Sequence, residues 1–280
     1  IKAARTADEV TNTAIESLAK WDREQPLFAW IHYSDPHAPY KAHDEFDLHE
    51  DQPRDRSRGA KVRRGYDSEI AFMDAQIAAL LAALPSEDTF IVFVADHGES
   101  LWDHGYLGHG RRIYQDNLHI PFLVHGPGIA PGRSSSPARG IDVGPTVLAL
   151  AGLEPMPGAL GVSLVNGPPA SDRVRVIETY GGAVLKVPGV KEMMTDAGPQ
   201  RQAVLLEGWK LILAGRDVEL FHLPDDPAER TNLALEQPDR VRQLRALIEE
   251  WDRATASMTG QQAELNDADR EALKSLGYIQ

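Results

Sequence analysis

The feature that most constrains the fold of this chain is a short apolar segment that ends abruptly in polar residues. Residues Thr89–Val94 are β-branched or aromatic, and Ala95 is followed at once by Asp96, His97 and Gly98. An apolar run without polar alternation predicts a parallel strand that is covered on both faces. In open α/β sheets, binding sites lie just beyond the carboxyl ends of such strands. We therefore expect Asp96 and His97 to lie at a functional site.

The side chains of Asp96 and His97 carry the donor atoms of a metal site. A carboxylate oxygen and an imidazole nitrogen can bind the same divalent ion, and Gly98 permits the backbone bend that would turn both side chains toward it. The same three residues also fit a plain loop, in which Asp96 is solvated and His97 caps the strand end. Both interpretations remain open from this segment alone.

Length and composition limit the classes of protein to consider. A chain of 280 residues predicts one large domain with a smaller satellite. The formal net charge of -13 argues against nucleic acid as a partner. The sequence contains no cysteine, which excludes disulfides, thiolate metal sites and a cysteine nucleophile. No run reaches the ~18 apolar residues that a membrane span needs, so we expect none.

The amino-terminal part predicts a helix followed by a strand. Thr6 and Glu9 form a possible capping box, and apolar residues recur at helical spacing until Pro26. The apolar segment Leu27–Tyr33 then predicts a second strand. It ends in a loop whose closely spaced prolines would hold His37 exposed.

A charged segment separates this loop from a strongly periodic helix. Residues Lys41–Arg64 show no periodicity and predict a long surface loop bordering a cleft. Residues Tyr66–Leu84 predict a helix, and we expect its apolar stripe to be core. The stripe consists of Tyr66, Ile70, Met73, Ile77, Leu80, Leu81 and Leu84. A strand–helix–strand order predicts a βαβ unit, which would bring His37 and the Asp96–His97 pair to one cleft.

The pattern of predicted secondary structure changes near Pro168. Before it we expect a flexible loop over Leu101–Arg112, a strand over Ile120–Val124, and a short helix that Asp142 caps and Gly152 ends. After it, four short strands predict a small antiparallel sheet: Val174–Thr179, Ala203–Leu206, Trp209–Leu213 and Val218–His222. A final amphipathic helix would cover this sheet. We predict a catalytic α/β domain over residues 1–167, a small α+β subdomain over 168–257 and a tail over 258–280.

Several motifs carry a resemblance to a known family. The segments FAWIHYSDPHAPY (28–40), GYDSEIAFMD (65–74), ADHGE (95–99) and DHG (103–105) resemble the second half of a sulfatase of the alkaline-phosphatase superfamily. Glu219–Leu233 is similar to that family's closing strand and turn, and Leu273–Tyr278 to a frequent tail. The resemblance implies part of an α/β sandwich, with a mostly parallel sheet and helices on both faces. The small antiparallel sheet with its covering helix would follow.

The resemblance also implies roles for matched residues. Asp96 and His97 fall on two ligands of the family's divalent cation, usually Ca²⁺, although a histidine ligand also tolerates Mn²⁺. His37 falls on the histidine that contacts the ester and can protonate the departing oxygen. His109 falls where many members carry a lysine that touches a sulfate oxygen, so a titratable group replaces a fixed cation. His104 also matches a family position, and we expect it to order its loop.

One part of the family's machinery has no match here. Sulfatases attack with a formylglycine made within a Cys/Ser-x-Pro-x-Arg motif of the amino-terminal half. The letters Ser135–Arg139 fit that motif, but they lie in a polar loop after the metal pair, with no strand ahead, and we do not expect Ser135 to be the nucleophile. A chain that opens on a helix without a preceding strand fits the absence of that half. We therefore expect the missing amino-terminal half of the same enzyme to complete the site.

The sequence thus predicts metal-dependent hydrolysis of sulfate esters by the completed enzyme, with the isolated chain inactive. The substrate would be a sulfated small molecule or glycan, and the family favours a periplasmic or secreted location. Two alternatives stay open. The first is a phosphodiester or phosphonate monoester hydrolase of the same superfamily, and the second is a non-catalytic remnant that binds sulfate or glycans.

Overall fold

The computed structural model describes residues 5–49, 57–85, 87–167, 169–179 and 201–255. The chain divides into two compact units, with the boundary between Ser86 and Glu87. The predicted tail, including the motif at Leu273–Tyr278, lies outside the described residues. The predicted domain boundaries at 167 and 257 stay predictions.

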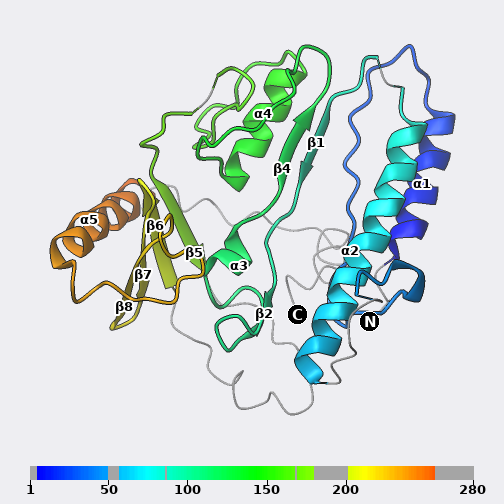
Figure 1. Cartoon of the computed structure of the whole chain (residues 1–280). Coiled ribbons are helices and arrows are strands. Elements are labelled where there is room, and N and C mark those ends of the chain that lie inside the picture. Colours follow the sequence, from blue (N-terminus) through cyan, green and yellow to red (C-terminus); the bar gives the residue numbers. More distant parts are fainter. Residues whose placement is uncertain (1–4, 50–56, 86, 168, 180–200, 256–280) are drawn as a thin grey trace, which may run out of the picture. The chain divides into compact units, whose positions relative to one another are not determined.

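The first unit is built on two packed helices, α1 (Ala7–Lys20) and α2 (Arg58–Ala83) (Figure 1). The predicted start of α1 is confirmed, since the Glu9 carboxylate accepts a hydrogen bond from the Thr6 amide at 3.2 Å. The second helix begins eight residues before the predicted Tyr66, because Ser57 caps it by accepting from the Ala60 amide at 3.3 Å. The expectation of a surface loop up to Arg64 is therefore wrong.

The buried face of α2 differs from the predicted apolar stripe. Ile70 and Leu81 are 37% and 42% exposed, whereas Ser68 and Glu69 are buried. The chain after the proline-rich loop lies along this polar face. Its backbone amides at Lys41 and His43 donate to Glu69 Oε1 at 2.9 Å and to Ser68 Oγ at 3.1 Å. These polar side chains are buried because they satisfy the backbone of a neighbouring segment. A short 3₁₀ helix, η1 (Asp44–Phe46), follows.

The predicted strand over Leu27–Tyr33 is wrong. In the described part of the chain this segment has no hydrogen-bonded strand partner, and a strand exists only within such a ladder. It is attached instead to the two helices through the buried Thr11. The Thr11 hydroxyl donates to Gln76 O at 3.1 Å and lies 2.8 Å from the Tyr33 hydroxyl. The βαβ unit predicted from this segment is therefore also not observed.

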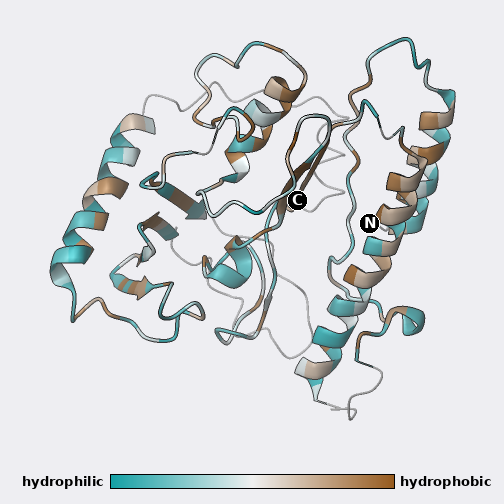
Figure 2. Cartoon of the chain, turned by 45° about the horizontal axis from the view of Figure 1, so that its top comes forward, coloured by the Kyte–Doolittle hydropathy of each residue, from teal (hydrophilic) through white to brown (hydrophobic). Residues whose placement is uncertain are grey.

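The second unit begins with the apolar strand that the sequence predicted. This strand, β1 (Ile91–Val94), pairs with β4 (Phe122–His125), and Figure 2 shows the hydrophobic character of both. The pairing is antiparallel, with Ile91 opposite His125 and Val94 opposite Phe122, so the prediction of a parallel strand is wrong for this pair. A short helix, α3 (Gln115–Leu118), lies between these strands in the sequence.

The connection from β1 to β4 is more ordered than predicted. The segment expected to be a flexible loop contains a hairpin of two short strands, β2 (Ser100–Leu101) and β3 (Leu107–Gly108). The buried Ser100 hydroxyl closes it by donating to Tyr106 O at 2.9 Å. The turn between the strands includes Gly105 at φ 68°, a conformation that glycine adopts without strain.

The predicted antiparallel sheet and its helix are confirmed. The sheet has the order β5 (Arg175–Thr179), β6 (Arg201–Leu206), β7 (Trp209–Ala214) and β8 (Asp217–His222), with every neighbour antiparallel. Helix α5 (Pro238–Thr255) packs on β6 and β7 (Figure 1). Leu244 and Ile248 of α5 are buried against one face of the sheet.

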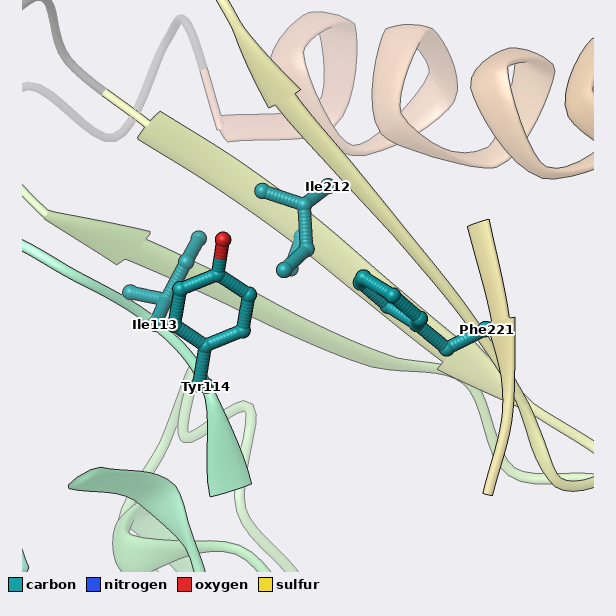
Figure 3. Close-up of a cluster of buried hydrophobic side chains, with 5 residues drawn as sticks. Ile113, Tyr114, Ile212 and Phe221 are labelled. Atoms are coloured by element: carbon teal, nitrogen blue, oxygen red, sulfur yellow. The ribbon is translucent and has the colours of Figure 1, made fainter. Parts of the chain in front are cut away.

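The opposite face of this sheet packs against the segment that leads into α3. Ile113 and Tyr114 form a buried cluster with Ile212 and Phe221 of the sheet (Figure 3). Successive residues along each strand alternate between the two faces, which is the period-2 pattern of a sheet: Leu211 faces α5 and Ile212 faces the opposite side. The sheet therefore has two apolar faces, and one of them fixes the chain just downstream of His109.

A short helix lies at its predicted position, but Asp142 does not cap it as predicted. Helix α4 (Val143–Leu150) follows the 3₁₀ turn η2 (Gly140–Asp142) and ends before Gly152, whose φ is 66°. The buried Asp142 carboxylate makes no capping bond to this helix. Each of its oxygens instead accepts from Arg173 at 2.7 Å, so Asp142 connects two distant segments.

No helix in the described part of the chain is long and apolar enough to cross a membrane.

A buried ion pair joins the sheet to α3. Lys210 Nζ lies 2.6 Å from Glu229 Oε1, and the two side chains are 0% and 1% exposed. The second oxygen of Glu229 accepts from the backbone amide of Gln115 at 2.6 Å. Burial lowers the pKa of Lys210, and the neighbouring Glu229 opposes that shift. The pair thus fixes the start of α3 against β7.

We expect Lys210→Met to lower the free energy of unfolding of the 280-residue chain by about 3–5 kcal/mol, because Glu229 would stay buried without its cation. Urea unfolding followed by circular dichroism measures this. The matched control is Arg242→Met, which removes an exposed ion pair with Asp239 and should cost about 1 kcal/mol or less. A loss at Lys210→Met as small as that of the control would contradict the role given to the buried pair.

Gly98 brings the chain after β1 into close contact with α3. Its amide donates to Asn117 O at 2.9 Å. A Cβ atom at this position would lie 2.1 Å from the backbone oxygen of Asp116, so no side chain fits without a shift of backbone. The position of the Asp96–His97 segment therefore depends on a residue without a side chain.

We expect Gly98→Ala to lower the free energy of unfolding by about 1–3 kcal/mol, because the methyl group overlaps backbone rather than a movable side chain. Gly132→Ala is the matched control, since a Cβ atom there meets nothing within 4 Å. That change should stay within about 0.5 kcal/mol of the wild type in the same urea experiment. Equal stability of the two variants would show that the contact with α3 is not tight.

Candidate metal centre

Asp96 and His97 lie directly beyond the end of β1, where the sequence placed them. The Asp96 carboxylate is exposed, and its Oδ1 accepts a hydrogen bond from the His97 amide at 2.9 Å. This contact turns the chain at the strand end, and the close packing of Gly98 on α3 holds the turn. The second carboxylate oxygen points to the imidazole of the next residue.

The ring of His97 presents one nitrogen toward that carboxylate. Its Nδ1 lies 2.8 Å from Gly98 O, and because a carbonyl oxygen can only accept, Nδ1 carries the hydrogen. In the neutral ring Nε2 then has a lone pair, and this atom lies 3.6 Å from Asp96 Oδ2. A lone pair and a carboxylate oxygen at this separation repel unless a proton or a cation lies between them. The donor set therefore fits a divalent cation, with the backbone carbonyl fixing the ligand tautomer.

His109 stacks on His97 and is held by a carboxylate. The two imidazole rings have centroids 4.0 Å apart with 25° between their planes. His109 Nδ1 lies 3.1 Å from Oε2 of Glu99, whose side chain is nearly fully buried. The Glu99 carboxylate can only accept, so Nδ1 of His109 carries a hydrogen and the contact fixes the orientation of the ring. Glu99 was part of the quoted motif, but nothing in the motif indicated that it would orient His109.

The other predicted histidines have separate contacts. His104 lies in the second unit and stacks on Tyr114, with centroids 3.8 Å apart, which supports a loop-ordering role. His37 belongs to the first unit, where it is exposed and its Nδ1 lies 2.8 Å from Ala38 O. Because a carbonyl oxygen can only accept, Nδ1 carries a hydrogen in this contact. The cleft shared by His37 and Asp96 stays a prediction.

The loop with the Ser-x-Pro-x-Arg letters lies in the second unit. Ser135 is exposed, and the neighbouring Ser136 amide donates to Ser134 Oγ at 3.1 Å. Arg139 donates to Leu160 O at 2.7 Å and takes part in the packing around Asp142. The local contacts of this loop are those of a folded connection between β4 and α4.

A second group of metal-ligand type lies in the first unit and was missed by the sequence reasoning. One ligand atom each from Asp35, His43 and Glu69 lies within 4.8 Å of the others. Burial raises the pKa of Glu69 to about 7, with a further contribution from the Asp35 charge. Burial also raises the pKa of Asp35. A glutamate within the predicted helix gave no signal of its own, because its burial depends on a distant segment of the chain.

The chain is similar in sequence to known sulfatases. The chain is 29% identical over 271 residues to a choline-sulfatase of Rhizobium meliloti, a match that covers 81% of this chain and 51% of that protein. It is 29% identical over 196 residues to arylsulfatase K of Xenopus laevis, covering 65% of this chain and 35% of that protein. The chain thus spans about half the length, or less, of these curated relatives.

Solved structures show the same fold. The chain aligns with the phosphonate monoester hydrolase of Agrobacterium radiobacter at a TM-score of 0.70 and 22% identity, covering 95% of this chain and 65% of that one. It aligns with BT4656, solved with D-glucosamine-2-N,6-O-disulfate, at a TM-score of 0.68 and 18% identity, covering 95% and 71%. These likenesses confirm the predicted α/β fold class.

The family assignment rests on a longer match than any of the quoted motifs. The Sulfatase family profile matches residues 4–153, which include the ADHGE segment, the stacked histidines and the proline-rich loop of His37. That match covers more than half of the sequence, and the chain therefore belongs to the sulfatase family.

Proposed function

We propose that this chain forms the metal-binding and leaving-group part of an enzyme that hydrolyses sulfate esters. The observation that carries the proposal is the pair formed by His97 Nε2 and Asp96 Oδ2, 3.6 Å apart at the end of β1. The family supports hydrolysis of sulfuric esters in general terms. The substrate is then a sulfated small molecule or glycan, and the location periplasmic or secreted.

Asp96 and His97 would hold the divalent cation, and we propose Ca²⁺, with Mn²⁺ as the alternative. A bound cation would withdraw negative charge from the oxygens of the ester group. The oxygen of Asp96 suits Ca²⁺, whereas the nitrogen of His97 also suits Mn²⁺. His97 Nδ1 keeps its hydrogen and donates it to Gly98 O, so the ring would bind the cation through Nε2 as a neutral ligand.

The two further histidines would act on the ester itself. His109, with its Nδ1 proton directed to Glu99, would bind a sulfate oxygen through Nε2–H. His37 would donate a proton to the departing oxygen. The attacking group is assigned to residues beyond this chain, because the sequence has no cysteine and Ser135 lies in an exposed connection.

We expect Asp96→Ala and His97→Ala in the whole enzyme to lower bound metal and kcat together, because each removes a ligand. His37→Ala should lower kcat by roughly 10²- to 10⁴-fold with the metal retained. Metal content by plasma mass spectrometry, measured beside aryl sulfate hydrolysis, distinguishes the two results. His119→Ala, an exposed histidine at the end of α3, is the matched control and should change neither.

Two outcomes would contradict these roles. Loss of metal in His37→Ala would make that residue a ligand rather than a proton donor. Full metal content in both Asp96→Ala and His97→Ala would contradict the proposed centre.

We also expect His37→Ala to slow substrates with good leaving groups less than substrates with poor ones, because a good leaving group needs no proton.

The phosphonate monoester hydrolase is the second candidate, since its structure shares this fold. Paired substrates with the same leaving group, an aryl sulfate and an aryl phosphonate monoester, separate the two functions. We expect the whole enzyme to have the larger kcat/KM for the sulfate. The 280-residue chain alone should hydrolyse neither over many turnovers. A larger kcat/KM for the phosphonate would assign the protein to the second function.

A further inference from the structure

We propose that Asp35, His43 and Glu69 form a binding site for a divalent ion of the zinc type in the first unit. The ligand atoms of these three residues lie within 4.8 Å of one another. They come from three parts of the sequence, namely the proline-rich loop, the segment before η1 and the middle of α2. The inference concerns metal binding and does not depend on the proposed sulfatase activity.

Glu69 supplies the most specific evidence. The residue is 3% exposed, and its Oε1 accepts from the Lys41 amide at 2.9 Å. Its other oxygen, Oε2, is buried and has no hydrogen-bond partner among the described residues. A buried carboxylate oxygen without a partner is costly, so a ligand for it would stabilise the fold. The helix fixes the side chain, and the Lys41 amide fixes its orientation.

His43 presents a second buried atom without a partner. Its ring stacks on Phe72, with centroids 4.2 Å apart and 13° between the planes. The ring of Phe46 is nearly perpendicular to it, with the two centroids 6.5 Å apart. Its backbone amide is held by Ser68. Nε2 is buried and has no hydrogen-bond partner within the described residues. Packing therefore holds the ring in place while one nitrogen remains available.

The charges of the group favour a bound cation. Asp35 and Glu69 repel each other at short range, and Asp8 adds to the negative charge near Asp35. His43 and the Lys41 side chain act in the opposite direction. A proton shared between the two carboxyl groups could also relieve the repulsion, but it would leave Nε2 of His43 without a partner. A metal ion satisfies all three residues at once.

The donor set selects the kind of metal. One imidazole nitrogen and two carboxylates suit Zn²⁺, whose catalytic sites use three protein ligands and keep the fourth position for a water. Ca²⁺ prefers six to eight oxygens and fits less well. In a tetrahedral site with ligand distances of about 2.0–2.1 Å, the donor atoms lie about 3.4 Å apart. The ligand atoms, now within 4.8 Å of one another, would thus draw together by up to about 1.4 Å on binding.

The test uses the 280-residue chain with Asp96→Ala and His97→Ala, so that the other proposed ligands are absent. After chelator treatment, Zn²⁺ alone is titrated by calorimetry. We expect one tightly bound equivalent and a rise in Tm on addition of the metal. Glu69→Gln keeps an acceptor for Lys41, and His43→Phe keeps the stack on Phe72. Each should weaken binding by about tenfold or more.

Glu45→Gln is the matched control, since Glu45 is an exposed acid of η1 outside the group, and it should leave binding unchanged. Circular dichroism confirms that each variant is folded, and Asp35→Asn replaces any variant that is not. The proposal is overturned if no one-to-one binding is found. It is equally overturned if binding survives in Glu69→Gln and His43→Phe, or if Glu45→Gln weakens it as much as they do.

Discussion

The geometry of the candidate metal centre depends on the close packing of Gly98 against α3. Because a Cβ atom would collide with Asp116 O, only glycine allows the chain to turn there and place Asp96 and His97 at the strand end. Helix α3 is in turn held by Glu229, which accepts from the Gln115 amide and pairs with the buried Lys210. The small carboxyl-terminal sheet therefore positions a site that lies more than a hundred residues earlier in the sequence.

The sequence predicted those features that depend on local pattern. The apolar run before Asp96 was correctly predicted to be a strand, and the four short strands with their covering helix were found where alternation and turns placed them. The capping box at Thr6 and the stop at Gly152 follow from backbone chemistry that a few neighbouring residues decide. The motif resemblance gave the family, because spaced motifs carry more information than composition.

Features that depend on distant partners could not be predicted. Glu69 is buried because the amide of Lys41 needs an acceptor, and Asp142 is buried because Arg173 binds it. Glu69 lies within α2, and Asp142 precedes α4. The periodicity of these helices does not show which distant residue each carboxylate binds. The antiparallel pairing of β1 has the same origin, since an apolar strand fits either direction until its neighbour is known. Polar residues on a buried face are therefore where sequence reasoning failed, and they are also where one candidate ligand group lies.

We propose that His97 serves as a neutral ligand through Nε2, with Gly98 O fixing its tautomer. This role would explain why His97 lies at the end of β1 and why Gly98 packs closely on α3. The most direct measurement is a crystal structure of the whole enzyme with its metal, using anomalous scattering to locate the ion. We expect an ion bound to both His97 Nε2 and an oxygen of Asp96. An ion bound to neither atom, or to Nδ1 of His97, would contradict it.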